Sequence, residues 1–255
     1  MNVLIGAISS NYSINDIKRW VESSKIIDGK RILLLYNTKE GELVDYLKSQ
    51  DVEVLAPDFD YWGHKKDKFE VNTANANFNS TYDLIHNSRF LHIYYSLFDT
   101  EYEKVLITDV KDVYFNSDPF IKLSKSKITA TSEVITYNNH EWNKNHALTN
   151  LGILGTELLG NEVYNVGVFG GGLDIVRKIC RDIYLLSVGK PKVADQTSFN
   201  YLINTLYKDH TNFTGLNDYL AVHLHVVSEG KVNFNFKELD KYPIVHQYDR
   251  FNGKI

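Results

Sequence analysis

The chain has 255 residues, of which 43% are hydrophobic, and it carries a formal net charge of −4. This length and hydrophobic content suffice for one large α/β domain or two small ones with a substantial core. The acidic balance argues against nucleic acid as a partner, because a surface that binds phosphate backbones depends on clustered Lys and Arg.

Cysteine content and apolar runs indicate the cellular setting. The single cysteine, Cys180, cannot form an intrachain disulfide, and the N-terminal sequence MNVLIGAISS lacks the basic start and long apolar core of a signal peptide. No apolar stretch approaches the roughly 18 to 20 residues needed to cross a bilayer. We therefore expect a cytoplasmic protein without a transmembrane segment, so that any membrane association would be peripheral.

The N-terminal part alternates between predicted strands and helices. Apolar runs predict strands at 2–8, 31–37 and 52–57, and helical spacing of apolar residues predicts helices at 14–26 and near 39–49. This alternation predicts an α/β fold with a Rossmann-like, mostly parallel central sheet flanked by helices. Ligands of such sheets bind beyond the carboxyl ends of the strands.

The middle of the chain contains a long polar segment and then regular elements. Residues 58–80 are polar and aromatic without clear periodicity, so we expect a long loop, which in compact domains is often functional. A helix is predicted at 81–98, followed by strands at 104–109 and 128–134, and then by a mixed, partly helical segment.

Two amphipathic helices follow a glycine-rich strand in the last third. A strand and then a turn are predicted over 163–172, and the first helix comes directly after them. The second helix is predicted at 195–207, with Leu206 among its inward-facing residues. The segments AVHLHVV and KYPIVHQYDRF read as short strands and a terminal tail, and no linker divides the chain.

The most informative stretch is ITDVKDVYFNSDPF, residues 107–120, in which acids follow a buried strand. If the chain turns after the strand, Asp109 and Asp112 come within about 7 Å at Cα and can face a common point. Two such carboxylates repel one another unless a cation lies between them, and oxygen ligands favour Mg²⁺ or Mn²⁺. The alternative is that both acids are solvated turn residues and that Asp118 caps a turn before Pro119.

The acidic stretch resembles the metal-binding motif of nucleotide-sugar glycosyltransferases of the GT-A fold. Three further segments resemble that family in the expected order: YNVGVFGGG, ADQTSFNYL and IVHQYDRF, preceded by a helix-like NSRFLHIYYSLFDTEYEKVL. The resemblance covers roughly 85–251 and implies a single GT-A domain over 1–255, with a nucleotide-binding half at about 1–115 and an acceptor and sugar half at about 116–255. The chain departs from many GT-A enzymes in carrying D-x-x-D instead of D-x-D.

The resemblance implies a metal site and a phosphate site. Asp109 and Asp112 would hold Mn²⁺ (or Mg²⁺) together with the ribose and diphosphate of the donor, and His246 would complete the metal shell. Arg250 would contact a phosphate. The alternatives are a satisfied core or surface histidine and an ordinary surface arginine.

The same resemblance implies roles for polar residues elsewhere in the chain. Arg89 would lie near the diphosphate or the acidic motif, unless it is a solvated charge on a helix face. Asn165, Gly170 and Gly171 would face the sugar, although glycines there are also explained by a turn that needs positive φ. The Asp195–Gln196 pair would reach the sugar or the acceptor hydroxyl, although Asp195 is also well placed as a helix N-cap.

Two further positions are supported by the fold alone. The loop that includes Ala7 and Ser9 follows the first strand, and Asp58 and Asp60 follow the third, so both are placed to meet the base and ribose. Cys180 lies on the apolar side of a predicted helix, where a core position is expected.

The implied activity is a metal-dependent transfer of a sugar from a nucleoside diphosphate donor, a UDP-sugar in the first instance, to a hydroxyl of a glycan or other acceptor. Asp195, Gln196 and Asn165 are the candidate catalytic residues. One alternative is a sugar-nucleotide nucleotidyltransferase, although the first loop, GAISSNYS, has one glycine and no basic residue to hold a triphosphate. A phosphatase would carry its aspartyl nucleophile on the first strand. A non-catalytic carbohydrate-binding protein is the other alternative.

Overall fold

The computed structural model describes residues 1–57 and 81–251. A seven-stranded sheet has the order β3-β2-β1-β4-β7-β6-β8, and a three-stranded sheet has the order β5-β10-β9. The strands of the large sheet are β1 (Val3–Ser9), β2 (Lys30–Tyr36), β3 (Glu53–Leu55), β4 (Lys104–Thr108), β6 (Ile128–Thr136), β7 (Glu162–Gly172) and β8 (Thr211–Thr214). The small sheet consists of β5 (Val113–Phe115), β9 (Ala221–His223) and β10 (Ile244–His246). The helices are α1 (Ile14–Ser23), α2 (Glu42–Ser49), α5 (Thr81–Ser96), α6 (Glu141–Leu151), α7 (Leu173–Ser187), α8 (Asp195–Asn204) and α9 (Leu224–Ser228).

The large sheet is mostly parallel, as the alternating pattern predicts. Strands β3, β2, β1 and β4 all pair in parallel, so their carboxyl ends meet at one edge. Strand β7 then pairs antiparallel with both β4 and β6, and β8 pairs in parallel with β6. The α/β class with a mostly parallel central sheet flanked by helices is therefore confirmed.

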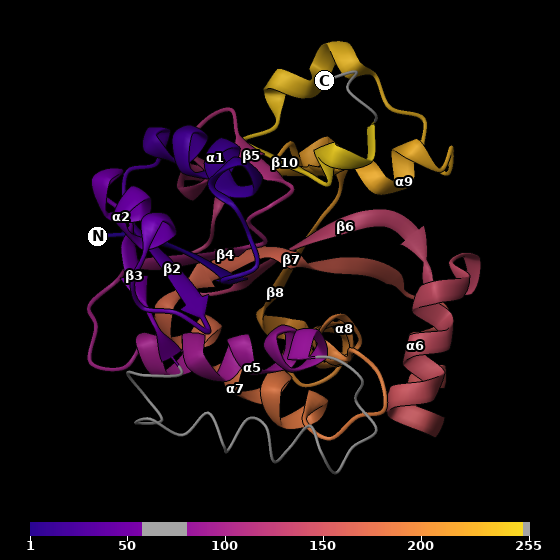
Figure 1. Cartoon of the computed structure of the whole chain (residues 1–255). Helices are drawn as coiled ribbons and strands as arrows, with labels where there is room; N and C mark the ends of the chain where they lie inside the picture. Colours follow the sequence, from indigo (N-terminus) through magenta and orange to yellow (C-terminus); the bar gives the residue numbers. More distant parts are fainter. Residues whose placement is uncertain (58–80, 252–255) are drawn as a thin grey trace.

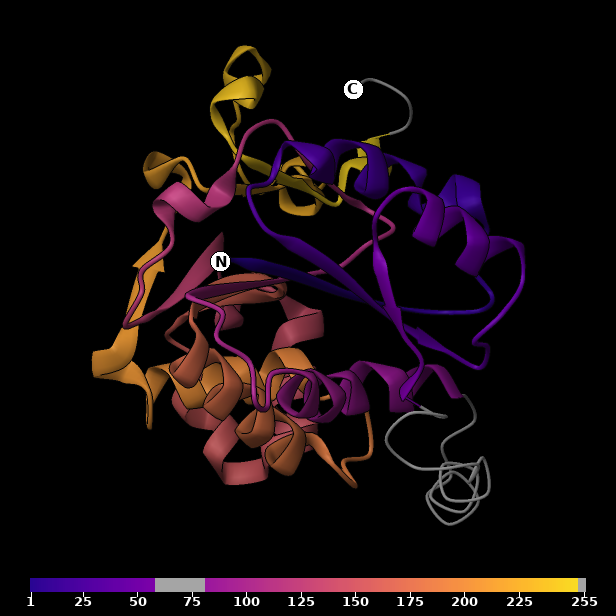
Figure 2. The same cartoon turned by 90° about the vertical axis from the view of Figure 1, so that its left-hand side faces the viewer.

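Helices cover both faces of this sheet (Figures 1 and 2). Alternate strand residues point to opposite faces, and the strands are apolar on both. On one face, Ile5 and Ile107 pack with residues of α5, α7 and α8. On the other face, Leu4 and Leu106 pack with residues of α1, α2, β5 and β10.

Helix α1 is joined to the end of β4 by one buried side-chain contact. Its apolar stripe buries Ile17, Trp20 and Val21 against the sheet. The indole Nε1–H of Trp20 donates to Thr108 Oγ1 at 3.0 Å. Because Thr108 is the last residue of β4, this bond helps to hold the point at which the acidic stretch begins.

The small sheet brings the C-terminal segment to the acidic stretch. Strand β10 pairs antiparallel with β5, with His246 opposite Val113. It also pairs in parallel with β9, with His246 opposite His223. Residues more than one hundred positions apart in sequence therefore lie side by side beyond the end of β4.

Most predicted elements are present, with shifts of a few residues at their ends, but some predictions are wrong. The segment 221–227 is a strand only to His223, after which α9 begins. Helix α8 ends at Asn204, and Leu206 beyond it is 66% exposed instead of facing inward. Cys180 is buried in the core as predicted.

Asp118 has the local role that was the alternative to a site role. Its side chain accepts from the backbone N–H of Phe120 at 3.0 Å and caps a short 3₁₀ helix, Pro119–Lys122, which begins with proline. The carboxylate of Asp118 is therefore explained by the turn itself.

No helix within residues 1–57 and 81–251 combines the length and the apolar character that a bilayer span requires.

Candidate functional site

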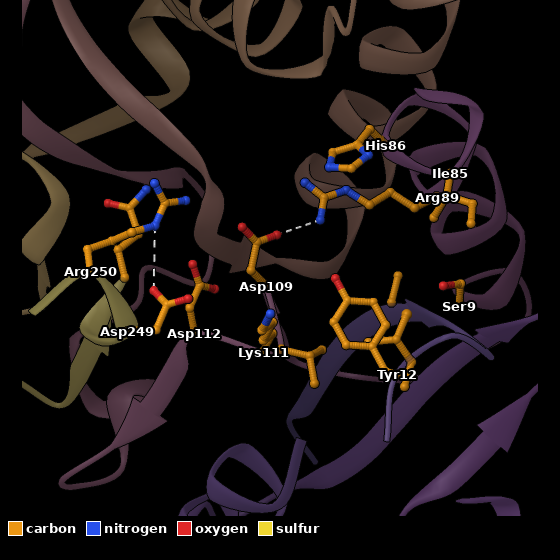
Figure 3. A pocket seen from close by; sticks show the side chains of 14 residues that line it. Ser9, Tyr12, Ile85, His86, Arg89, Asp109, Lys111, Asp112, Asp249 and Arg250 are labelled. Carbon is orange, nitrogen blue, oxygen red and sulfur yellow. Dashed lines mark hydrogen bonds and ion pairs between the residues drawn. The ribbon is translucent and has the colours of Figure 1, made fainter. Parts of the chain in front are cut away.

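The candidate site lies where β1 and β4 end, at the carboxyl edge of the parallel strands. Asp109 follows β4 directly, and its backbone N–H donates to the carbonyl of Gly167 on β7 at 2.7 Å. In Figure 3 the Asp109 carboxylate lies between the guanidinium of Arg89 and the carboxylate of Asp112. The position agrees with the expectation for ligand sites in parallel sheets.

Asp109, Asp112 and His246 converge in a geometry that fits a cation. One ligand atom from each residue lies within 4.8 Å of the others. His246 Nε2 is 3.4 Å from Asp109 Oδ2 and 3.6 Å from Asp112 Oδ1, which is too far for a good hydrogen bond. This nitrogen is buried and has no hydrogen-bond partner among the described residues. Two carboxylates and an unpartnered imidazole nitrogen that face one point form a donor set suited to Mn²⁺.

Asp109 and His246 shift one another's pKa, and the charge of Asp112 adds to the shift at His246. Burial lowers the pKa of His246, but the charges of Asp112 and Asp109 outweigh it and raise the pKa to about 10. Burial raises the pKa of Asp109, but the charges of Arg89 and His246 outweigh it and hold that pKa well below its usual range. The imidazolium thus balances the carboxylates, and His246 must lose this proton to bind a cation.

A second histidine orients the first. His246 Nδ1 lies 3.0 Å from His223 Nδ1, and His223 Nε2 lies 2.9 Å from Thr131 Oγ1. Burial lowers the pKa of His223 well below its usual value, and the charge of His246 lowers it further, so His223 is neutral. His246 therefore donates through Nδ1, which leaves Nε2 directed at the carboxylates. This is the arrangement that commonly supports a metal-binding histidine, and the sequence analysis missed His223.

Arg89 links two acidic residues from different parts of the chain. Its Nη1 donates to Asp109 Oδ1 at 2.6 Å, and its Nη2 donates to Asp195 Oδ2 at 3.2 Å. The arginine is 6% exposed, so the alternative of a solvated charge on a helix face is wrong. Burial lowers the pKa of Arg89, but Asp109 and Asp195 outweigh that effect and keep the guanidinium charged.

Asn165 contacts a buried acid that the sequence analysis did not identify. Its Nδ2 donates to Glu133 Oε1 at 2.6 Å, and its Oδ1 accepts from the backbone N–H of Gly167 at 2.7 Å. Burial raises the pKa of Glu133 to about 7, although the hydrogen bond from Asn165 opposes the shift. Glu133 lies on β6 among β-branched residues, a pattern that gave no signal beyond a buried strand.

The glycine that matters at this site is Gly167. A Cβ atom on Gly167 would overlap Asp109 Oδ2. By contrast, Gly170 and Gly171 pair with Leu106 and Val105, near the other end of β4, and line neither cavity described below. A Cβ on Gly171 would overlap the carbonyl oxygen of Lys127, so close backbone approach explains this glycine. The structure does not bring Gly170 and Gly171 to the site.

Asp195 and Gln196 lie beside Asn165, but Asp195 is not an N-cap. Helix α8 begins at Asp195 itself, and the N-cap is Ala194. Asp195 Oδ1 accepts from the backbone N–H of Gln196 at 2.8 Å. Gln196 Nε2 donates to Asn143 Oδ1 at 2.9 Å.

Two cavities meet at Asp109. The smaller has a volume of about 310 Å³, and its lining includes Ala7, Ser9, Asp109, Asp112 and Arg250 (Figure 3). The larger has a volume of about 810 Å³, and its lining includes Asn165, Asp195 and Gln196. Residues shared by both are His86, Arg89, Asp109, Gln247 and Arg250. Asp58 and Asp60 lie outside the described residues.

The lining of the larger cavity also includes a second group of polar side chains. This group includes His140, Trp142, His225, Glu229 and Lys231. Burial lowers the pKa of both His140 and His225, so both imidazoles are neutral near pH 7. None of these residues was singled out from the sequence.

Comparison with known proteins assigns no family to the chain. No protein-family model matches its sequence, and a search of curated proteins also finds no match.

Proposed function

We propose that this protein is a metal-dependent glycosyltransferase of the GT-A fold. It transfers a sugar from a nucleoside diphosphate donor, in our proposal a UDP-sugar, to a hydroxyl of a glycan or other acceptor. The observation that carries the proposal is the convergence of Asp109, Asp112 and His246 within 4.8 Å of one another. Their meeting point borders a polar cavity at the carboxyl edge of the parallel strands.

The sheet supports this proposal without deciding it. In the sheet, four parallel strands from the first 108 residues are followed by the antiparallel strand β7. Strand β7 carries Asn165 and Gly167. Ala7 and Ser9 line the smaller cavity at the end of β1, where a nucleotide bound at this edge would lie. The smaller cavity is therefore the proposed donor site, and the larger cavity is the proposed acceptor site.

The residues divide into two groups by chemistry. Asp109, Asp112 and His246 would hold Mn²⁺ or Mg²⁺, which when bound neutralises a diphosphate and stabilises it as a leaving group. Arg250 and Lys111 line the same cavity and add positive charge where the phosphates would lie.

Asn165, Asp195 and Gln196 lie on the other side of Asp109, where the sugar and acceptor would meet. Both oxygens of Asp195 accept a hydrogen bond, Oδ2 from Arg89 and Oδ1 from Gln196. Each carboxylate oxygen has a second lone pair, so Asp195 is the candidate base for the acceptor hydroxyl if the transfer inverts the anomeric centre. If the transfer retains the anomeric configuration, the departing diphosphate can take the proton of the acceptor hydroxyl.

Isothermal titration with UDP, with and without Mn²⁺, tests the proposal. We expect Mn²⁺ to increase UDP affinity at least about tenfold in the wild type, because the cation bridges the carboxylates and the diphosphate. The Asp112→Ala variant should lose this increase. Asp209→Ala removes an exposed acid far from the site in sequence and is the matched control. UDP affinity that is independent of Mn²⁺ would contradict the proposal.

A panel of nucleotide sugars then separates the alternatives. A glycosyltransferase should hydrolyse or transfer from at least one nucleotide sugar in a Mn²⁺-dependent manner and release nucleoside diphosphate. A nucleotidyltransferase would instead release pyrophosphate from a nucleoside triphosphate and a sugar phosphate. A carbohydrate-binding protein would turn over neither substrate.

A further inference from the structure

The larger cavity contains a second cluster of metal-ligating side chains, separate from Asp109, Asp112 and His246. His140 precedes α6, His225 lies on α9, and Glu229 follows the end of α9. One ligand atom from each residue lies within 4.8 Å of the others. These are two imidazoles and one carboxylate, whereas the first site has one imidazole and two carboxylates.

The distances in the second cluster are close to those of a metal site. His225 Nε2 lies 3.3 Å from Glu229 Oε1, and His140 Nε2 lies 3.7 Å from Glu229 Oε2. Ligands about 2.0 to 2.1 Å from a tetrahedral Zn²⁺ lie roughly 3.3 Å apart. The three ligand atoms, which lie within 4.8 Å of one another, would have to approach to distances of this size around the ion.

We propose that His140, His225 and Glu229 form a Zn²⁺ site in the wall of the larger cavity. Two imidazole nitrogens and one carboxylate are a ligand set that Zn²⁺ uses when one coordination position stays open. The open position would face the cavity that these three residues line. The ion would also join the start of α6 to α9, which are separate elements. This proposal does not depend on the proposed glycosyl transfer.

Two residues beside the cluster, Asn143 and Lys231, oppose an ion at this position. The side-chain amide of Asn143 lies 2.9 Å from His140 Nδ1. This nitrogen also accepts from the backbone N–H of Asn143 at 3.3 Å, and Asn143 Oδ1 already accepts from Gln196, so the proton of the neutral His140 ring lies on Nε2 and an ion there must displace it. Lys231 opposes the ion, because its Nζ lies 2.8 Å from Glu229 Oε2 and competes for the same carboxylate.

Zn²⁺ and Co²⁺ binding to the full chain, without nucleotide, tests the proposal. The background is Asp112→Ala, which disables the first cluster. We expect this protein to bind one equivalent of Zn²⁺ in competition with a chelating dye, and to show the visible absorption of four-coordinate Co²⁺. Adding His225→Ala should weaken Zn²⁺ binding at least about a hundredfold, since loss of supporting partners alone costs about 10- to 100-fold.

Matched variants separate a metal site from a general effect on the fold. His210→Ala removes an exposed histidine outside the cluster and should leave Zn²⁺ affinity unchanged. Lys231→Met removes the competing cation and should tighten binding roughly two- to fivefold. If His225→Ala lowers the urea midpoint in EDTA, Glu229→Gln provides a second test of the same ligand set.

Two results would overturn the proposal. One is that the Asp112→Ala protein binds no Zn²⁺. The other is that the His225→Ala and His210→Ala variants bind it equally well. Failure of the Mn²⁺–UDP titration would leave this result unaffected, because the Zn²⁺ measurement uses neither nucleotide nor an intact first cluster.

Discussion

At the scale of single residues, Arg89 is the buried cation that connects two acidic side chains of the site. It is 6% exposed and contacts Asp109 and Asp195, residues that are 86 positions apart in the sequence. The family resemblance suggested that Arg89 lies near the acidic motif, and the sequence left open whether it was solvated. Burial was decided by the packing of α5 against α7 and the sheet.

Replacement of this arginine should cost stability as well as binding. Arg89→Met keeps the length of the side chain but leaves the buried Asp195 carboxylate and the partly buried Asp109 without their cation. We expect the free energy of unfolding to fall by about 3 kcal/mol, and Mn²⁺-dependent UDP binding to be lost. Urea denaturation measures the first effect and calorimetry the second. Arg181→Met, at a half-exposed arginine, is the control, and an equal loss in both variants would contradict the prediction.

The buried Glu133 should make stability depend on pH. Burial raises its pKa in the folded protein to about 7 from the ordinary value of 4.5. Its contribution is therefore fully present below about pH 4.5 and is lost as pH rises to about 7, because in this range the carboxyl ionises in the unfolded chain while the buried carboxyl stays protonated. Relative to wild type, Glu133→Gln should gain roughly 3 kcal/mol between pH 4.5 and pH 8.

Urea denaturation in EDTA at pH 4.5 and pH 8 measures this gain. Glu157→Gln is the control, because Glu157 is an exposed acid that lines neither cavity. The difference in stability between this variant and wild type should be the same at both pH values. A Glu133→Gln variant whose difference from wild type does not change with pH would show that Glu133 is not buried in this way.

At the scale of elements, the insertion of β10 between β5 and β9 forms the proposed metal site. Strand β10 places His246 beside Val113, one residue after Asp112. The segment after β10 is held by Arg19 of α1, whose guanidinium lies 3.9 Å from the ring centre of Tyr114 and 4.2 Å from that of Tyr248. Tyr248 also donates its hydroxyl to the carbonyl of Lys111 at 3.0 Å. The acidic loop and the C-terminal segment are therefore positioned together.

Loss of this arginine should loosen the C-terminal segment. Two cation–π contacts at a partly exposed site contribute about 1 to 2 kcal/mol, so Arg19→Ala should lower the free energy of unfolding by about that amount. Mn²⁺-dependent UDP affinity should also fall, because Tyr248 supports the loop that carries Asp112. Lys18→Ala changes the neighbouring exposed residue and should do neither. Urea denaturation and calorimetry measure both variants.

At the scale of the whole molecule, the proposed metal site joins segments from both halves of the chain. Asp109 and Asp112 belong to the first half, and His246 lies close to the end of the described chain. Their approach requires the large sheet, the small sheet and α5 to be folded at once. A cation bound there should therefore stabilise the entire fold instead of one loop.

Mn²⁺ at about 100 times its dissociation constant should raise the free energy of unfolding by about 2.7 kcal/mol, because it binds the folded chain only. The Asp112→Ala variant should show no such increase, and excess EDTA should reverse it in the wild type. Thermal and urea denaturation of the two proteins with and without Mn²⁺ measure the effect. If Mn²⁺ stabilised both proteins equally, the ion would not bind at Asp112, and the prediction would be wrong.

The sequence by itself determined the local features of this protein. Hydrophobic periodicity identified the strands, most helices and the α/β class, because side-chain burial follows the repeat of each element. The spacing of Asp109 and Asp112 predicted that they would face a common point, because a single turn controls their separation. The structure brings them together with His246, which only a family resemblance had suggested.

Only the tertiary structure decided the rest, because buried polar groups depend on partners that are distant in the sequence. Glu133 and His223 have no local signal, and the pKa of each is shifted mainly by its burial in the folded chain. Gly167 and Gly171 lie on the same strand, but only the pairing of β7 with β4 places Gly167 against Asp109. His140, His225 and Glu229 likewise become a cluster only when α6 and α9 border the same cavity.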